Sequence, residues 1–242
     1  MFLNPFVSQE IVEHGMDDPT IPVVMQPSYA QAYEDVIIDG LLYALLTKKN
    51  RLDLDFFEIG ANHPVATSAS YLLKKKYGVH TVLVEANPKL IAELKAKRPD
   101  DTVINAAITN QDVDSVEFCI SPDNEISSIN EDFVKAWKNG EIVEKIRVPA
   151  LRINQLIQRF YIHEFVDMII SIDIEGHDYE VLTDLDFERF RPLIIIVEPS
   201  EEFAPGTVEK MMTFMQSKGY SCLLYTSPSP RDRTRSRMPS SA

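Results

Sequence analysis

The fold is decided by residues 80–108, HTVLVEANPKLIAELKAKRPDDTVINAAI, in which a helical pattern separates two apolar runs. The first run, Thr81–Glu85, has the length of a buried strand and ends on a carboxylate. Residues 88–99 start with a proline, which suits the first turn of a helix, and end at another proline. The second run, 102–108, is again typical of a strand. This order predicts two parallel strands joined by a crossover helix.

The same alternation continues on both sides of this unit. Its further elements are strand 52–61, helix 65–78, strand 165–176, short helix 178–190, strand 192–199, helix 207–220 and strand 221–225. A helix is also expected from Ser28, which would be its N-cap. The run 192–199 is nearly all apolar, as expected for a strand with both faces covered. We therefore predict an α/β fold with a mostly parallel sheet, in one domain that covers residues 28–226.

The two ends of the chain differ from this domain in composition. Residues 1–27 contain four prolines, so we expect an irregular N-terminal segment. Residues 227–242 are rich in Ser, Arg and Pro and have almost no apolar side chains, which predicts disorder. This tail also resembles a translated cloning adaptor more than a native sequence.

The composition is that of a globular protein and argues against several classes of function. Apolar residues make up 45% and charged residues 25% of the 242 residues. The net charge of −13 disfavours a nucleic-acid partner, whose phosphates the protein would repel. No apolar run reaches the roughly 18 to 20 residues that span a bilayer, and no signal peptide is readable. Two cysteines in strand-like runs complete the expectation of a cytoplasmic protein without a membrane partner.

Polar residues at the predicted strand ends are candidate ligand contacts, because ligands bind beyond the carboxyl ends of parallel strands. Glu58 closes the first strand just before Gly60, which permits close approach of the backbone. Glu85 closes the second, where an acidic residue can bind both ribose hydroxyls of an adenosine. Alone it is more typical of a solvated strand end, but together with Glu58 and Gly60 a ligand contact is favoured. Asn105 and Ala106 end the third and could line an adenine. The further glycines of a dinucleotide fingerprint are missing, which disfavours an NAD-dependent oxidoreductase.

The segment SIDIEGHD, residues 171–178, carries the most reactive side chains. Asp173, Glu175 and His177 are two positions apart, so they share one face as long as the chain is extended. Two carboxylates and an imidazole can deprotonate a hydroxyl, or they can bind a divalent metal. Asp178 instead suits the cap of the next helix.

Several segments, in the same order, resemble the FkbM-type S-adenosylmethionine-dependent methyltransferases. They are SYAQAYEDVII, FFEIGANHP, LVEANPKL, VINAAI, ISSI, SIDIEGHDYEVL and RPLIIIVE, and they cover about residues 28–225. The resemblance implies a Rossmann-like three-layer sandwich with S-adenosylmethionine (SAM) as cofactor. It also implies O-methylation of a hydroxyl on a sugar or another small acceptor. The last hairpin strand of the family has no counterpart before the unusual tail, so we expect it to be missing.

The resemblance extends the set of expected site residues. The expected cofactor-binding residues are Gln31, Asp35, Glu58, Gly60, Asn62, Glu85, Asn87, Asn105 and Ala106. Asp173 and His177 are the expected catalytic residues, and Glu175 is an expected substrate contact. No metal is assigned, but a metal-assisted methyltransferase with Asp173, Glu175 and His177 as ligands remains an alternative. A non-catalytic SAM-binding or scaffold protein is the alternative from another class.

Overall fold

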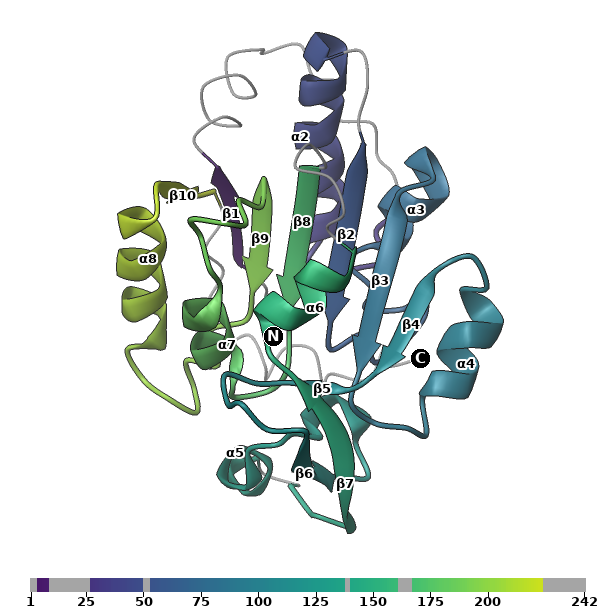
Figure 1. The fold of residues 1–242 in the computed structure, drawn as a ribbon, viewed down its shortest axis with the longest axis vertical. Helices are drawn as coiled ribbons and strands as arrows, with labels where there is room; N and C mark the ends of the chain where they lie inside the picture. The colour runs from purple at the N-terminus through teal and green to yellow at the C-terminus, as the bar shows by residue number, and fades with distance from the viewer. Residues whose placement is uncertain (1–3, 9–26, 50–52, 138–139, 161–166, 224–242) are drawn as a thin grey trace, which may run out of the picture.

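A computed structural model describes residues 4–8, 27–49, 53–137, 140–160 and 167–223. Its main sheet has seven strands (Figure 1). In spatial order they are β10 (Tyr220–Cys222), β1 (Asn4–Ser8), β9 (Ile194–Val197), β8 (Asp167–Ile172), β2 (Leu54–Ile59), β3 (His80–Glu85) and β4 (Thr102–Asn105). The five strands from β9 to β4 are parallel. The predicted α/β fold with a mostly parallel sheet is therefore confirmed.

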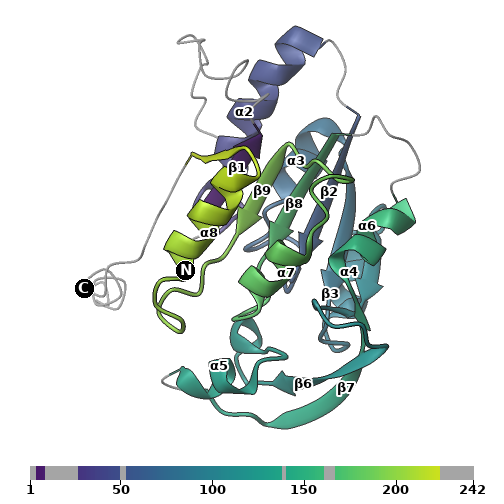
Figure 2. The ribbon, with the colours of Figure 1, turned by 60° about the vertical axis from the view of Figure 1, so that its left-hand side comes forward.

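Helices cover both faces of this sheet, as Figure 1 and Figure 2 show. Because strand side chains alternate between faces, Phe57 and Ile170 pack against α6 (Ile153–Phe160), α7 (Asp178–Asp184) and α8 (Thr207–Ser217). Phe56 and Ile169, on the opposite face, pack against α2 (Glu34–Lys49) and α3 (Tyr71–Tyr77). Helix α4 (Ile91–Lys97) packs on the same side through Leu94. These layers form the expected three-layer sandwich.

A smaller sheet lies beyond the carboxyl ends of the parallel strands (Figure 1). Its strands are β5 (Ala107–Ile108), β7 (Glu144–Leu151) and β6 (Ser115–Ile120), in that spatial order. A 3₁₀ turn, η1 (Asn124–Ile126), and helix α5 (Glu131–Ala136) follow β6 in the chain. The predicted strand 102–108 is therefore divided, because the chain leaves β4 after Asn105 and pairs with β7 instead of β3.

Two predicted helices begin later than expected, and in both cases a polar interaction explains the difference. Helix α3 starts at Tyr71 rather than at 65, because Ser68, Ala69 and Ser70 bind a buried carboxylate of β2. Helix α2 starts at Glu34, and Ser28 is not its N-cap. The Ser28 hydroxyl instead donates a hydrogen bond to Asp35 in the first turn.

The N-terminal segment is not wholly irregular, which corrects the sequence prediction. Residues Asn4–Ser8 form β1, which lies antiparallel between β9 and β10. Five residues that include a proline carry no local signal for a pairing partner so distant in sequence. The expected missing hairpin strand and the tail at 227–242 lie outside the described residues, as do residues 9–26. Within the described ranges, no helix has the length and apolar character needed to cross a membrane.

Candidate functional site

A cavity lies where the carboxyl ends of β2, β3 and β8 meet the segments around the smaller sheet. From the main sheet and its adjoining turns it is lined by Ile59, Gly60, Asn62, Val84, Glu85, Ala86, Asp173, Ile174 and Glu175. From the segment before α2, from β5 and β6, and from the residues around η1 it is lined by Gln31, Ala107, Ile108, Phe118, Asn124, Glu125, Ser127 and Ile129. Thr67 and Ala106 complete the wall. The cavity thus occupies the position at which open parallel sheets bind their ligands.

Gly60 shapes the floor of this cavity. Its backbone has a φ of +89°, and a Cβ atom at this position would lie 1.7 Å from the carbonyl oxygen of Asp173. The Gly60 amide donates to the carbonyl oxygen of Val84 at 2.9 Å, and the Asp173 amide donates to that of Ile59 at 3.0 Å. Only glycine fits here, because any side chain would push apart the ends of β2 and β8.

The Glu85 carboxylate faces the cavity from the end of β3. Its Oε2 accepts a hydrogen bond from the Asn62 amide at 2.8 Å, and its Oε1 accepts one from the Asn87 amide at 2.6 Å. Burial raises the pKa of Glu85, while these two amides act in the opposite direction. A carboxylate oxygen can accept more than one hydrogen bond, so both oxygens remain able to bind a ligand hydroxyl. Glu85 therefore lines the cavity and is not an exposed strand end.

Asn87 and Asn105 support this strand end and do not line the cavity. The Asn87 side chain accepts from the Lys89 amide at 3.1 Å and donates to Asn124 at 3.3 Å. The Asn105 amide group donates to the carbonyl oxygens of Glu85 and Ala86 at 2.8 and 3.0 Å. Their side chains are thus engaged in holding the turn after β3, whereas Ala106 does reach the cavity wall.

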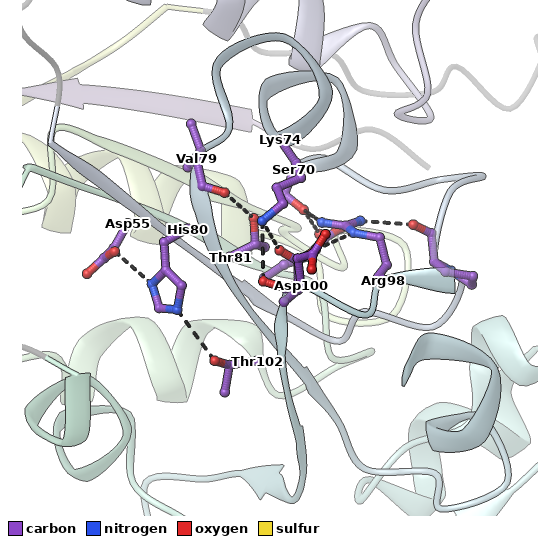
Figure 3. A network of polar contacts seen from close by, with 12 residues as sticks. Asp55, Ser70, Lys74, Val79, His80, Thr81, Arg98, Asp100 and Thr102 are labelled. Atoms are coloured by element: carbon purple, nitrogen blue, oxygen red, sulfur yellow. Dashed lines mark hydrogen bonds and ion pairs between the residues drawn. The ribbon is translucent and has the colours of Figure 1, made fainter. Parts of the chain in front are cut away.

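Glu58 does not line the cavity either, which differs from the expectation for this residue. Its carboxylate accepts hydrogen bonds from the Ser68 and Ser70 hydroxyls and from the Ala69 amide. Arg98 donates to Ser70 at 3.0 Å and forms an ion pair with Asp101. Figure 3 shows Ser70 and Arg98 facing each other. This Glu58 network (Glu58, Ser68, Ser70, Arg98, Asp101) is buried and joins β2 to α3 and to the turn after α4.

Gln31 and Asp35 precede β2 and were both expected to bind the cofactor, but only one of them reaches the cavity. Gln31 lines the cavity. Asp35 is fully buried and accepts hydrogen bonds from the Ser28 hydroxyl at 2.6 Å and from the Tyr29 amide at 2.7 Å. Asp35 therefore fixes the turn that carries Gln31 and is not itself a cavity residue.

Three acidic residues gather on the β8 and β9 side of the cavity and form what we call the carboxylate cluster (Asp173, Glu175, Glu198). One carboxylate oxygen of each lies within 4.8 Å of the others. Asp173 and Glu175 line the cavity, and Glu198 follows directly after β9. The close grouping of Asp173 and Glu175 was expected, but the third member is Glu198 and not His177.

The turn that carries Asp173 and Glu175 is held in an unusual conformation. Glu175 has a φ of +61°, which is rare for a residue with a side chain. The Ser128 hydroxyl donates to its carbonyl oxygen at 2.6 Å. From the other side, the Asp178 carboxylate accepts from the amides of Ile174 and Gly176 at 2.8 and 3.1 Å. Strained backbone of this kind persists where the surroundings enforce it, and it is common at functional sites.

Burial and mutual repulsion make the members of the carboxylate cluster weak acids. Burial raises the pKa of Asp173 to about 6, although a hydrogen bond with Glu198 acts in the opposite direction. Burial also raises the pKa of Glu175 and that of Glu198 well above their usual values, and the charge of Asp173 adds to both shifts. The neighbouring Asp178 has its pKa raised to about 8 by burial and by Asp173. Ionisable groups perturbed in this way are frequent at functional sites.

His177 and Asp178 lie at the start of α7 and do not line the cavity. For His177 this differs from the expected catalytic position. His177 is the residue before α7, with Nε2 3.4 Å from the Thr109 hydroxyl and Nδ1 3.8 Å from the Glu180 carboxylate. It does not line the cavity, because the left-handed backbone at Glu175 and Gly176 breaks the extended geometry that would have kept all three side chains on one face. Asp178 is the first residue of α7 and holds the preceding turn, close to the predicted capping role.

Sequence reasoning missed Glu198 and Glu34. Glu198 directly follows the all-apolar strand β9. An acid at the end of an apolar run is the same signal that drew attention to Glu85 and Asp173. Glu34 is fully buried in the first turn of α2, and its Oε1 has no hydrogen-bond partner among the described residues. No pattern in the sequence marks Glu34, because its burial depends on the packing of α2.

A family model described as "Methyltransferase FkbM domain" matches residues 58–222, more than half of the chain. The matched range starts at the end of β2 and ends in β10, so it includes the other four parallel strands, the smaller sheet and the carboxylate cluster. No curated protein and no solved structure gave a match.

Proposed function

The chain belongs to the FkbM methyltransferase family, and from this premise we propose that it transfers a methyl group from SAM to a hydroxyl of a small acceptor, such as a sugar. One observation carries the proposal. The cavity at the strand ends has the Glu85 carboxylate on one side and the Asp173 carboxylate on another. The first suits the ribose of a nucleoside cofactor, and the second suits a hydroxyl that must lose its proton.

The residues around Glu85 fit SAM. Glu85 would accept hydrogen bonds from the two ribose hydroxyls, since its oxygens are held in place by the Asn62 and Asn87 amides. Apolar side chains that include Val84, Ile108 and Phe118 supply surface for an adenine ring. When bound, SAM supplies a methyl group carried by a positively charged sulfonium. The acidic lining of the cavity favours such a cation.

Asp173 is the proposed contact of the reacting hydroxyl. It lines the cavity, and its Oδ1 has no hydrogen-bond partner among the described residues. With a pKa raised to about 6, its carboxylate is still largely ionised at neutral pH, so it can accept the proton. The protein otherwise contributes alignment, because methyl transfer requires the acceptor oxygen in line with the methyl carbon and the sulfur.

The nature of the acceptor is proposed from charge and from the walls of the cavity. A net charge of −13 disfavours nucleic acid. The side of the cavity formed by β6 and the residues around η1 includes polar groups from Asn124, Glu125 and Ser127, which can bind hydroxyls. A small molecule with several hydroxyls, such as a sugar or a glycan end, meets both conditions.

A labelled-methyl assay tests this function. Purified protein is incubated with SAM that carries a labelled methyl group, against a panel of sugars and other polyols and a matched panel of amines. We expect label in at least one hydroxylated product, attached to oxygen. Binding of SAM without transfer to any acceptor would support the SAM-binding alternative, and transfer to amines alone would contradict O-methylation.

A further inference from the structure

The carboxylate cluster presents oxygen atoms that no described side chain uses. Asp173 Oδ1, Glu175 Oε2 and Glu198 Oε2 are each buried and lack a hydrogen-bond partner among the described residues. Glu175 is 7% exposed and Glu198 is 6% exposed, so neither carboxylate is satisfied by bulk water. Buried polar atoms without partners are rare in native proteins, and each calls for a physical reason. Three of them in one place point to a shared ligand.

The surroundings of the cluster add negative charge. The side chains that act most strongly on Glu175 are Asp173, Asp178, Glu125 and Asp123, all of them acidic. For Glu198 they are Asp173, Glu175 and Asp178. A further buried carboxylate, Glu34, has an unpartnered oxygen and also interacts electrostatically with Asp173. Charges taken out of water need opposite charge nearby, and these neighbours do not supply it.

Two kinds of positive charge can compensate such a group, namely protons and a cation. Asp173 and Glu198 act directly on each other's pKa, so a proton on one of the two acids would relieve part of their repulsion. One proton cannot provide partners for all three unpartnered oxygens. A metal cation between the three side chains would bind one carboxylate oxygen of each, since one oxygen of each residue lies within 4.8 Å of the others.

The ligand atoms indicate the class of ion. All three are carboxylate oxygens, which hard cations such as Mg²⁺, Mn²⁺ and Ca²⁺ prefer. Among the described residues no nitrogen or sulfur ligand joins them. His177 lies near Thr109 and Glu180 instead. Asp173 and Glu175 also line the cavity, so an ion between them would keep open positions toward a ligand.

A second acidic group in the molecule shows what a compensated cluster looks like. Glu117, Cys119 and Glu131 also bring their ligand atoms within 4.8 Å of one another. However, Lys145 lies 3.0 Å from Glu117 and 2.6 Å from Glu131, and Lys135 also pairs with Glu131. The lysines already provide the positive charge there, so this group needs no ion.

We propose that the carboxylate cluster binds one divalent cation through Asp173, Glu175 and Glu198. A hydroxyl of the acceptor that entered the open coordination positions would have its pKa lowered by the ion. In that case Asp173 would act as a metal ligand, and the ion would take over its part in activating the hydroxyl. The inference concerns binding of a cation and does not depend on SAM or on any acceptor.

Titration with Mn²⁺ tests the site directly. The full chain is stripped with a chelator, dialysed and titrated with MnCl₂, while free Mn²⁺ is followed by electron paramagnetic resonance. We expect saturable binding of one ion per chain. Glu175→Gln and Glu198→Gln should each weaken binding by about tenfold or more, because each removes a charged ligand. Circular dichroism confirms that both variants are folded.

The matched control is Glu117→Gln, in the group that lysines already neutralise. Its Mn²⁺ affinity should equal that of the unaltered chain. No saturable binding, or binding that persists unchanged in both cluster variants, would overturn the proposal. Methyl transfer that continues after exhaustive chelation would support the proposed function and would show that the ion is not needed for it. Failure of cation binding can therefore be distinguished from failure of methyl transfer.

Discussion

The Glu58 network and the carboxylate cluster are two groups of buried acids at the ends of neighbouring parallel strands, yet they are built in opposite ways. In the Glu58 network, hydroxyls, a backbone amide and the Arg98 guanidinium surround the acids. In the carboxylate cluster, acids face other acids, and three oxygens have no partner among the described residues. Of the two groups, only the carboxylate cluster lines the cavity. Acids without compensating partners therefore mark the candidate site, whereas compensated acids belong to the supporting structure.

Removing the cation from the Glu58 network should have the largest effect on stability. Arg98 is 3% exposed, pairs with Asp101, and donates to the Pro64 carbonyl oxygen at 2.9 Å. Arg98→Ala removes the buried guanidinium and leaves Asp101 with Lys74 as its ion-pair partner, so we expect a loss of about 3 to 5 kcal/mol in the free energy of unfolding. Urea denaturation measures it. A loss below about 1 kcal/mol, the usual range for surface pairs, would mean that the network is not a structural unit.

Substitutions of Glu85 and of Glu58 should have different effects on the affinity for SAM. Glu85→Ala is expected to weaken SAM binding by about 1 to 3 kcal/mol, the range for a lost hydrogen bond to a charged group. Glu58→Gln should leave SAM affinity unchanged and lower only the stability, because Glu58 does not line the cavity. Isothermal titration calorimetry separates the two. The comparison fails if Glu58→Gln lowers the affinity and Glu85→Ala does not.

Neutralising one member of the carboxylate cluster should leave the stability unchanged or raise it slightly, whereas Arg98→Ala should lower it. Glu198→Gln removes one acid from a group of acids in which the charge of Asp173 already raises the pKa of Glu198. We expect the chelator-stripped variant to equal the unaltered chain or to exceed it by up to about 1 kcal/mol in urea denaturation. A strong destabilisation would show that Glu198 is a structural acid like Glu58.

The smallest effect is expected at the lysine that neutralises the second acidic group. Lys145 on β7 pairs with Glu117 on β6 and with Glu131 on α5, and all three side chains are exposed. Lys145→Ala should therefore leave the thermal midpoint unchanged within error, since exposed ion pairs contribute little. A clear drop in the midpoint at low salt would show that this cluster needs its lysines as the Glu58 network needs Arg98.

The sequence predicted most of the fold because the parallel strands and their helices follow local patterns. The apolar run of β9 and the two prolines around α4 are examples. Strand β1 could not be foreseen in the same way, because its place between β9 and β10 depends on contacts across almost the whole chain. The division of strand 102–108 likewise depends on its pairing with β7.

The site was only partly predictable, for a related reason. Strand ends are readable from the sequence, and Glu85 ends β3 while Gly60 and Asp173 directly follow β2 and β8. Whether a strand-end acid faces a ligand depends on its partners, and Glu58 finds its partners in Arg98 and the serines before α3. The prediction that His177 lies in the cavity was wrong, because the left-handed backbone conformation at Glu175 cannot be read from residue spacing.

The most direct test of the account is the turnover of Asp173→Asn beside that of His177→Ala, both saturated with SAM. We predict that Asp173→Asn loses about 100-fold or more in the rate of methyl transfer while it still binds SAM, because the hydroxyl loses the group that activates it. His177→Ala should keep a rate close to that of the unaltered protein, since His177 lies outside the cavity. Unchanged turnover in Asp173→Asn, or a comparable loss in His177→Ala alone, would contradict the assignment of the carboxylate cluster to the chemistry.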